Sequence, residues 1–463
     1  MLIKILPRKK HTLRELLIDR GVVLAGECGG QGKCGQCRVK VNNRLVLACQ
    51  FIPDAPVMVE LEENPAPASA RISTCRRRNL VLAADIGTTT ITLAAVDPEQ
   101  GRAVRTTTQL NPQARLGADV ISRIAQAARV RKIRLTALLE QFIQEAGIDP
   151  RRVVTAVGNT VMMHFLFNQS PAGLGSYPYR SRLPLKQVLT SRIDRLRLRT
   201  LPLLGSFIGS DCTAAIIASG IYRHKQPALL IDAGTNGELI LGNRDRLLVC
   251  STAAGPAFEG ATLECGSLFQ PGAVVAAEYK TGRWQLKTAG RLKPKSICGS
   301  GVLDVVASGL KAGLILPSGR LAAGNRLTIY EDHGRALYLS QADLRQVQLA
   351  KAAIAAGIRI LLKRWFGTEQ QFNRIDRLII TGRFGNRINP ESAFTIGILP
   401  RVRFAIIRQH PNLALAGAIK AVTNPEIVPL ARTIARRCEE VVLSEQPEFE
   451  SLFVSGMELK RWE

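Results

Sequence analysis

Two distant segments of the chain share one pattern of apolar and polar residues. VLAADIGTTTITLAAVD (81–97) and ALLIDAGTNGELILGN (228–243) each contain an apolar strand that ends in Asp, a Gly-Thr turn and a second apolar strand. The two aspartates, Asp85 and Asp232, are 147 residues apart, a separation of domain size. The pattern therefore predicts two similar α/β lobes, each opening with a β-hairpin.

The remaining periodicity predicts a small N-terminal module, a linker and several helices. Residues 1–62 combine strand-like alternation with one amphipathic helix, which favours an α+β module of the β-grasp type. Residues 63–79 are rich in Pro, Ala and charge and lack a hydrophobic period, as linkers do. The two lobes then occupy residues 80–222 and 223–463. Strands are expected at 1–7, 37–41 and 57–62, and helices at 12–21, 118–130, 211–222, 343–366 and 412–422, the last capped by Asn412.

Four cysteines of the N-terminal module have the spacing of an iron-sulfur ligand set. GECGGQGKCGQC (26–37) and LACQ (47–50) contain Cys28, Cys34, Cys37 and Cys49. Two irons sharing two sulfides need four thiolates, and the interspersed glycines allow the backbone to wrap closely around a cluster. Zinc is the main competitor, although only Cys34 and Cys37 form a C-x2-C pair. The pattern favours a 2Fe-2S cluster.

The two hairpin turns carry the residue types of a nucleotide phosphate site. Asp85 and Asp232 are expected to hold Mg²⁺ directly or through its waters. Backbone N–H groups and hydroxyls of the turns are expected to face phosphate oxygens. These turn residues are Gly87, Thr88, Thr89, Thr90, Gly234, Thr235 and Asn236.

Further candidates lie outside the turns. Glu238 and Glu259 could orient an attacking water, although a supporting or ion-pair role is equally ordinary for them. Gly299 and Ser300 in CGSGVLD are expected to border the nucleotide. His164, which lies in an apolar run with no second His nearby, is expected to be a packed core residue rather than a metal ligand.

The charge of the chain is strongly positive. The 463 residues carry a formal net charge of +26, but the arginines are dispersed, as in SRIDRLRLRT (191–200), and aromatic residues make up only 5%. With no nucleic-acid-binding motif either, nucleic acid is an unlikely partner, and a generally basic surface or an acidic protein partner is the better account. No apolar run approaches the roughly 18 residues of a membrane span, and MLIKILPRKK (1–10) lacks a signal-peptide core. The expected location is cytoplasmic, without membrane contact.

The order of these segments resembles the actin, sugar-kinase and chaperone ATPase superfamily. The resemblance makes the two hairpin turns the phosphate motifs, residues 209–220 and 412–422 the connecting helices, and LIITGRFGN (378–386) the adenosine motif with Gly382 and Gly385. It implies two RNase H-like lobes with ATP in the cleft between them. Arg383 stands where the adenosine motif usually has a second glycine.

Longer strings resemble one family more closely, the reductive activators of corrinoid proteins, and the resemblance covers nearly the whole chain. Members of that family have an N-terminal ferredoxin module and an actin-like ATPase region. The stretch of 11 residues between Cys37 and Cys49 is shorter than is usual in the family. The strings are NPQARLGADVISRI, VGNTVMMHFL, CSTAAGPAFEGA, ICGSGVLD, VQLAKAAI and GNRINPESAFTIGILP.

The resemblance implies an ATP-dependent electron-transfer function. The 2Fe-2S module would accept an electron from a low-potential donor and pass it to the Co(II) corrinoid of a partner methyl-transfer protein, regenerating Co(I). ATP binding or hydrolysis with Mg²⁺ would drive a closure that favours transfer. Two alternatives stay open: a ferredoxin-fused metabolite kinase and a nucleotide-binding redox sensor without turnover.

Overall fold

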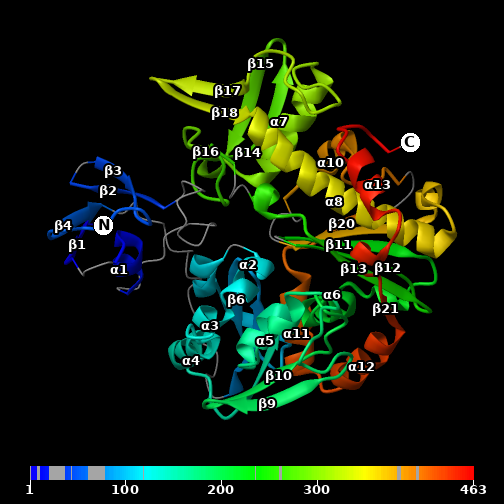
Figure 1. The fold of residues 1–463 in the computed structure, drawn as a ribbon. Helices are drawn as coiled ribbons and strands as arrows, with labels where there is room; N and C mark the ends of the chain where they lie inside the picture. Colours follow the sequence, from blue (N-terminus) through cyan, green and yellow to red (C-terminus); the bar gives the residue numbers. More distant parts are fainter. Residues whose placement is uncertain are drawn as a thin grey trace. The chain divides into compact units, whose positions relative to one another are not determined.

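The chain forms two compact units (Figure 1). The computed structural model describes residues 2–7, 11–19, 37–42, 44–60, 79–117, 119–234, 236–259, 263–382, 387–402 and 406–462. Unit 1 comprises residues 1–211 and 418–428, and unit 2 comprises residues 212–417 and 429–463. The chain passes between units within α6 (Ser210–Ser219) and α11 (Leu413–Thr423), the two segments predicted as connecting helices, and again in the first turn of α12 (Ile427–Arg437).

The N-terminal segment of unit 1 contains a four-stranded sheet and one helix. Strand order is β1-β4-β2-β3, and α1 contributes Leu13 and Leu17 to a core shared with Val39 and Val59. The three predicted strands and the helix are present, whereas β3 was not anticipated. The elements are β1 (Leu2–Ile5), α1 (Leu13–Asp19), β2 (Arg38–Val41), β3 (Arg44–Leu47) and β4 (Val57–Glu60).

The rest of unit 1 is built on a six-stranded sheet of order β7-β6-β5-β8-β10-β9. Strands β5, β6 and β7 are antiparallel neighbours, and β8 and β10 continue the sheet parallel to β5. The strands are β5 (Val81–Ile86), β6 (Thr90–Asp97), β7 (Arg102–Leu110), β8 (Val153–Val157), β9 (Leu189–Ile193) and β10 (Leu196–Thr200). The main helices are α2 (Val120–Ala125), α3 (Ala127–Val130), α4 (Leu135–Ala146) and α5 (Thr160–Leu166).

One predicted helix of unit 1 is interrupted. The segment 118–130 forms two short helices, because Gln126 between them has φ −112° and ψ 24°, outside the helical range. The first of them, α2, begins with a capping box between Asp119 and Ser122.

The interpretation of His164 as a packed residue is confirmed: it is fully buried, and its Nε2 accepts the backbone N–H of Arg182 at 3.1 Å.

Unit 2 repeats the strand arrangement of unit 1. Its six-stranded sheet has the order β20-β19-β11-β12-β13-β21, in which β11, β12 and β13 are antiparallel neighbours and β19 and β20 continue parallel to β11. The predicted internal repeat is therefore confirmed. The strands are β11 (Ala228–Ala233), β12 (Gly237–Gly242), β13 (Leu247–Thr252), β19 (Arg377–Thr381), β20 (Ile406–Gln409) and β21 (Cys438–Glu440).

A long helix organises the core of unit 2. Helix α8 (Gln341–Phe366) begins with a capping box formed by Ser340 and Asp343, is terminated by Gly367 with φ 82°, and packs on β12 and β13 (Figure 1). Unit 2 also contains α7 (Gly299–Lys311), α10 (Pro390–Ile396), α13 (Phe449–Ser455) and, from Pro429 on, α12 (Ile427–Arg437). Its smaller sheets contain β14 (Ala273–Lys280), β15 (Arg283–Thr288) and β16 (Ser296–Ile297), and β17 (Arg326–Asp332) with β18 (Arg335–Ser340). No helix in these described ranges is long and apolar enough to cross a membrane.

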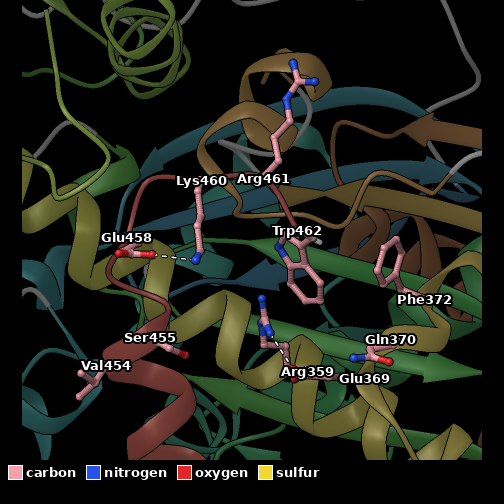
Figure 2. A pocket seen from close by; sticks show the side chains of 10 residues that line it. All are labelled: Arg359, Glu369, Gln370, Phe372, Val454, Ser455, Glu458, Lys460, Arg461 and Trp462. Atoms are coloured by element: carbon pink, nitrogen blue, oxygen red, sulfur yellow. Dashed lines mark hydrogen bonds and ion pairs between the residues drawn. The ribbon is translucent and has the colours of Figure 1, made fainter. Parts of the chain in front are cut away.

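The last residues of the chain are held against α8. Lys351 is buried and donates through Nζ to the Gly456 carbonyl at 2.7 Å, and Gln348 donates to the Met457 carbonyl at 2.7 Å. Beyond this anchor the C-terminal segment borders a cavity of about 500 Å³ (Figure 2). At its wall Arg359 forms an ion pair with Glu369 at 2.8 Å and lies over the ring of Trp462. The cavity contains none of the residues predicted to bind nucleotide or metal.

The buried Lys351 predicts a pH-dependent stability. Burial lowers the pKa of Lys351 from 10.5 to about 8, so between these values the folded state has released a proton that the unfolded state still holds. Stability then rises with pH, by roughly 3 kcal/mol across the window. In urea unfolding, we expect the unfolding free energy of the wild type to rise by this amount between pH 8 and 10.5, relative to that of Lys351→Met. The exposed lysine of the same helix, in the variant Lys363→Met, should show no such gain; equal profiles for both variants would contradict the prediction.

Candidate functional site

The first predicted phosphate turn lies at one edge of the unit 1 sheet. Asp85 is near the end of β5, directly beside Val157 at the end of the parallel strand β8. The turn that follows is tightly built, because a Cβ at Gly87 would stand 2.6 Å from the Thr90 carbonyl oxygen. Thr88 is buried, and its hydroxyl accepts a hydrogen bond from Asn159 Nδ2 at 2.8 Å. Asp85 and Thr88 are thus held at the same edge of the sheet.

Two buried polar side chains brace this turn. Asn111 donates to the Gly87 carbonyl at 2.8 Å, and its own backbone N–H donates to the Thr89 carbonyl. Arg123, which is fully buried, donates to the Thr88 carbonyl and, at 2.8 Å, to the Gly117 carbonyl. These bonds satisfy the carbonyls of the turn and hold the turn in one conformation. Sequence reasoning assigned no role to Asn111, Arg123 or Asn159, although all three lie in strings that carried the family resemblance.

The first connecting helix starts at the same edge. The backbone N–H of Ser210 donates to the Gly158 carbonyl at 2.9 Å, and there is no room for a Cβ at Gly209 against the Gly158 carbonyl oxygen and the backbone of Asn159. Asp211, in the first turn of α6, therefore lies close to the end of β8.

The second turn, in unit 2, brings three predicted residues together. Asp232 and Glu238 are direct cross-strand partners in the β11–β12 hairpin, and Glu238 is buried. Gly382, at the end of the adjacent parallel strand, has φ +90° and abuts Asp232: a Cβ there would lie within 3.0 Å of both Asp232 Oδ1 and the Ala233 carbonyl oxygen. The turn is closed by the Gly234 N–H, which donates to the Asn236 carbonyl at 3.2 Å. Two neighbouring carboxylates beside a glycine fit a hydrated Mg²⁺ at a nucleotide phosphate.

The other predicted nucleotide residues of unit 2 are not all described. Thr235, Gly385 and the side chain of Glu259 lie outside the described residues. Gly299 and Ser300 are buried at the start of α7, where the Ser300 hydroxyl donates to the Val275 carbonyl at 2.9 Å.

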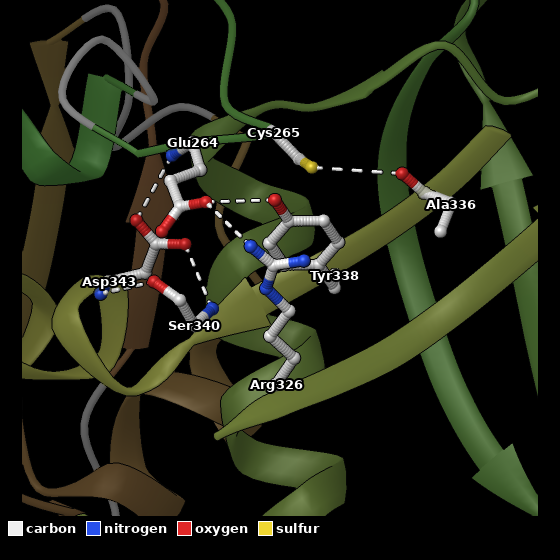
Figure 3. A network of polar contacts seen from close by, with 7 residues as sticks. All are labelled: Glu264, Cys265, Arg326, Ala336, Tyr338, Ser340 and Asp343. Atoms are coloured by element: carbon white, nitrogen blue, oxygen red, sulfur yellow. Dashed lines mark hydrogen bonds and ion pairs between the residues drawn. The ribbon is translucent and has the colours of Figure 1, made fainter. Parts of the chain in front are cut away.

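A polar network fixes the chain that follows the segment of Glu259 (Figure 3). The backbone N–H of Glu264 donates to Asp343 Oδ1 at 3.0 Å, and the Glu264 carboxylate accepts from the Tyr338 hydroxyl at 2.8 Å. That hydrogen bond lowers the pKa of Glu264, and Arg326 lies over the Tyr338 ring. Because Glu264 and Cys265 are bonded to Tyr338 and Ala336 of β18 and to Asp343 of α8, the network has a structural role.

Two of the four predicted cluster ligands lie side by side. Cys37 and Cys49 are buried free thiols, and the Cys49 backbone N–H donates to Cys37 Sγ at 3.4 Å. Burial raises the pKa of Cys37 to about 11, so a bound cation would be needed to hold it as a thiolate. Two buried cysteines, one of whose sulfurs accepts a backbone N–H bond and the other a side-chain amide N–H bond, fit an iron-sulfur ligand pair. Cys28 and Cys34 lie outside the described residues, and the remainder shows no cluster of three or more His, Cys, Asp or Glu that could hold a metal.

The brace at Arg123 gives a direct prediction. Arg123→Met removes the donor to two buried carbonyls, each worth roughly 1–3 kcal/mol when left unsatisfied, and frees the Thr88 turn to move. We expect lower unfolding free energy together with at least several-fold weaker binding of a fluorescent ATP analogue. The control is Arg199→Met. The guanidinium group that it removes donates to the Thr155 hydroxyl and to the Ala421 carbonyl, away from the turn. The control should lose stability and keep its nucleotide affinity; the same loss of affinity in both would contradict a local role.

Comparison with known proteins agrees with this arrangement. Residues 226–463 match the family model described as the C-terminal domain of RACo, the ASKHA domain, so this part of the chain belongs to the class of actin and sugar-kinase-like proteins. Residues 80–224 match the model of the RACo middle region. The chain therefore belongs to the RACo family, the reductive activators of corrinoid proteins that the sequence predicted.

Individual relatives have corresponding names. The corrinoid activation enzyme RamQ of Eubacterium limosum is 32% identical over 409 residues, which cover 80% of this chain and 68% of the relative. The [Co(II) methylated amine-specific corrinoid protein] reductase of Methanosarcina barkeri is 25% identical over 292 residues, 56% of this chain and 51% of the relative. The solved structure of a reductive activator for corrinoid, iron-sulfur protein covers 99% of this chain and 98% of its own, with a TM-score of 0.74 and 24% identity. This last match shows a shared fold.

Proposed function

We propose that the protein is an ATP-dependent reductive activator that returns the Co(II) corrinoid of a partner methyl-transfer protein to Co(I). Family membership supports the reaction class. The observation that best supports nucleotide binding is the close contact of Gly382 with the carboxylate of Asp232. These two residues are 150 positions apart in sequence, and a Cβ at Gly382 would not fit between them. The partner is a corrinoid protein, and the electron comes from a low-potential donor.

The residues have separate roles in this proposal. Asp85 and Asp232 would hold Mg²⁺, and the backbone and hydroxyl groups of both turns would contact phosphate oxygens. Glu238, held beside Asp232 by the hairpin register, orients the attacking water. Such a site works by positioning and by fixed electrostatics, so the bracing of each turn matters directly to the rate.

The N-terminal module is proposed to be a β-grasp ferredoxin domain. Cys28, Cys34, Cys37 and Cys49 would hold a 2Fe-2S cluster, which supplies one-electron transfer when bound. The adjacent, buried sulfurs of Cys37 and Cys49 support this ligand set. The small core around them excludes water from one side of the site.

Anaerobic purification followed by a spectral assay tests the proposal. We expect about two irons per chain, and we expect the reduced protein to convert a Co(II) corrinoid protein to Co(I) faster with MgATP than without it. Zinc in place of iron would contradict the cluster and favour the metabolite kinase. Iron without any effect of ATP on the cobalt spectrum would favour the redox sensor.

A further inference from the structure

An exposed β-hairpin of unit 1 gathers arginines on its surface. Strands β9 and β10 are joined by a two-residue turn, and their register places Arg192 directly opposite Arg197. Arg195 lies in the turn, and all three side chains are exposed. We call these three residues the arginine hairpin. Because β9 is the outermost strand of its sheet, the hairpin is open on one side to a partner (Figure 1).

The positive charge of the arginine hairpin is not neutralised within the described part of the chain. The one carboxylate of the turn, Asp194, is bound to Arg134 at 2.5 Å and to the Thr136 hydroxyl at 2.7 Å. None of the three hairpin arginines forms an ion pair with a described residue. The next arginine along the strand, Arg199, is half-buried and donates to the Ala421 carbonyl at 2.7 Å, so it serves packing rather than binding.

Two other antiparallel strand pairs compensate such charges. In the N-terminal sheet Lys40 is opposite Glu60 and pairs with it at 3.5 Å. In the β14–β15 hairpin Lys280 is opposite Arg283, but Lys280 pairs with Glu278 at 2.9 Å. Like charges placed directly opposite each other destabilise a sheet. An uncompensated pair therefore lowers the stability of the protein without a bound partner.

We propose that the arginine hairpin docks on an acidic face of the corrinoid protein; this proposal rests on the proposed function. Guanidinium groups form bidentate bonds to carboxylates, and an exposed, unpaired set of them accelerates encounter with an acidic surface. RNA is the less suitable partner, because its recognition relies on stacking aromatics and the segment from Leu189 to Thr200 contains none.

The test compares two charge reversals that alter net charge equally. Arg192→Glu/Arg197→Glu reverses the charge of the cross-strand pair in the arginine hairpin. Lys280→Glu/Arg283→Glu reverses a like-charged cross-strand pair in unit 2 whose lysine is compensated by Glu278, and each double substitution lowers the net charge of +26 by 4. Both are assayed as full chains for Co(II) reduction and for binding to immobilised corrinoid protein. We expect the first variant to lose roughly tenfold or more in kcat/KM at low salt through KM, with weaker salt dependence and unchanged basal ATPase. The control should change less than about twofold.

Several outcomes would overturn the docking proposal. Equal losses in both variants would show a bulk charge effect, and an unchanged KM in the first variant would show that the hairpin is not a contact. Self-association of the first variant with unchanged KM would mean that the arginines only protect a sheet edge. Loss of RNA binding alone would assign the hairpin to nucleic acid. The variant Arg192→Gln/Arg197→Gln, which removes the two charges without reversing them, serves as the control for correct folding. A wild-type chain that leaves Co(II) unreduced would instead overturn the proposed function.

Discussion

Gly382→Ala is expected to weaken the nucleotide response at least about tenfold while leaving the N-terminal module intact. The added Cβ would lie within 3.0 Å of Asp232 Oδ1 and of the Ala233 carbonyl oxygen, so either the carboxylate or the strand end must move. A shift of about 1 Å in a positioned group costs on the order of a hundredfold in rate. We expect ATP hydrolysis at the proposed site to fall by at least about tenfold, with the visible spectrum of the proposed 2Fe-2S cluster unchanged.

Gly367→Ala is the matched control for this substitution. Gly367 has φ +82°, close to the φ +90° of Gly382, but nothing lies within 4 Å of its ideal Cβ position. Both variants therefore carry the backbone strain of a left-handed residue, about 1–2 kcal/mol, and only Gly382→Ala carries the clash. Comparable loss of ATP hydrolysis in the two variants would show that strain, and not the position of Asp232, is responsible.

The hairpin sites could be predicted because their signals are local. An apolar strand, an Asp and a Gly-Thr turn are contiguous in sequence, and both copies form the expected hairpin. The pairing of Asp232 with Glu238 follows from the same turn, since its length fixes the register. The seating of Gly382 against Asp232 depends on β19 lying beside β11, which no local pattern reveals.

The braces of the first turn could not be assigned from sequence for the same reason. Asn111, Arg123 and Asn159 come from three separate elements and meet only through tertiary packing. A buried arginine also runs against the expectation that charged side chains are exposed. The arginine hairpin is a related case: SRIDRLRLRT was interpreted as dispersed charge, but the register aligns Arg192 with Arg197.

Gly417→Ala is expected to destabilise the chain at the point where its two connecting helices approach each other. A Cβ at Gly417 in α11 would lie within 3.0 Å of the carbonyl oxygen, carbonyl carbon and Cα of Ala214 in α6. Because these are backbone atoms, no side-chain rotation relieves the clash, and overpacking of this kind costs about 3 kcal/mol. We expect the melting temperature to fall by roughly 6–12 °C, even though Gly→Ala within a helix normally stabilises by about 1 kcal/mol.

Gly309→Ala separates close helix approach from helix propensity. Gly309 also lies inside a helix, α7, but its Cβ would meet only side-chain atoms of Ile315 and Leu327, which can adjust. Its melting temperature should change by no more than a few degrees, measured by calorimetry beside Gly417→Ala. Since the chain passes between the two units within α6 and α11, ATP hydrolysis by Gly417→Ala should also fall at temperatures well below its melting point. A Gly417→Ala protein as stable and active as the wild type would show that the helices separate at no cost, and that their close packing has no part in the ATPase cycle.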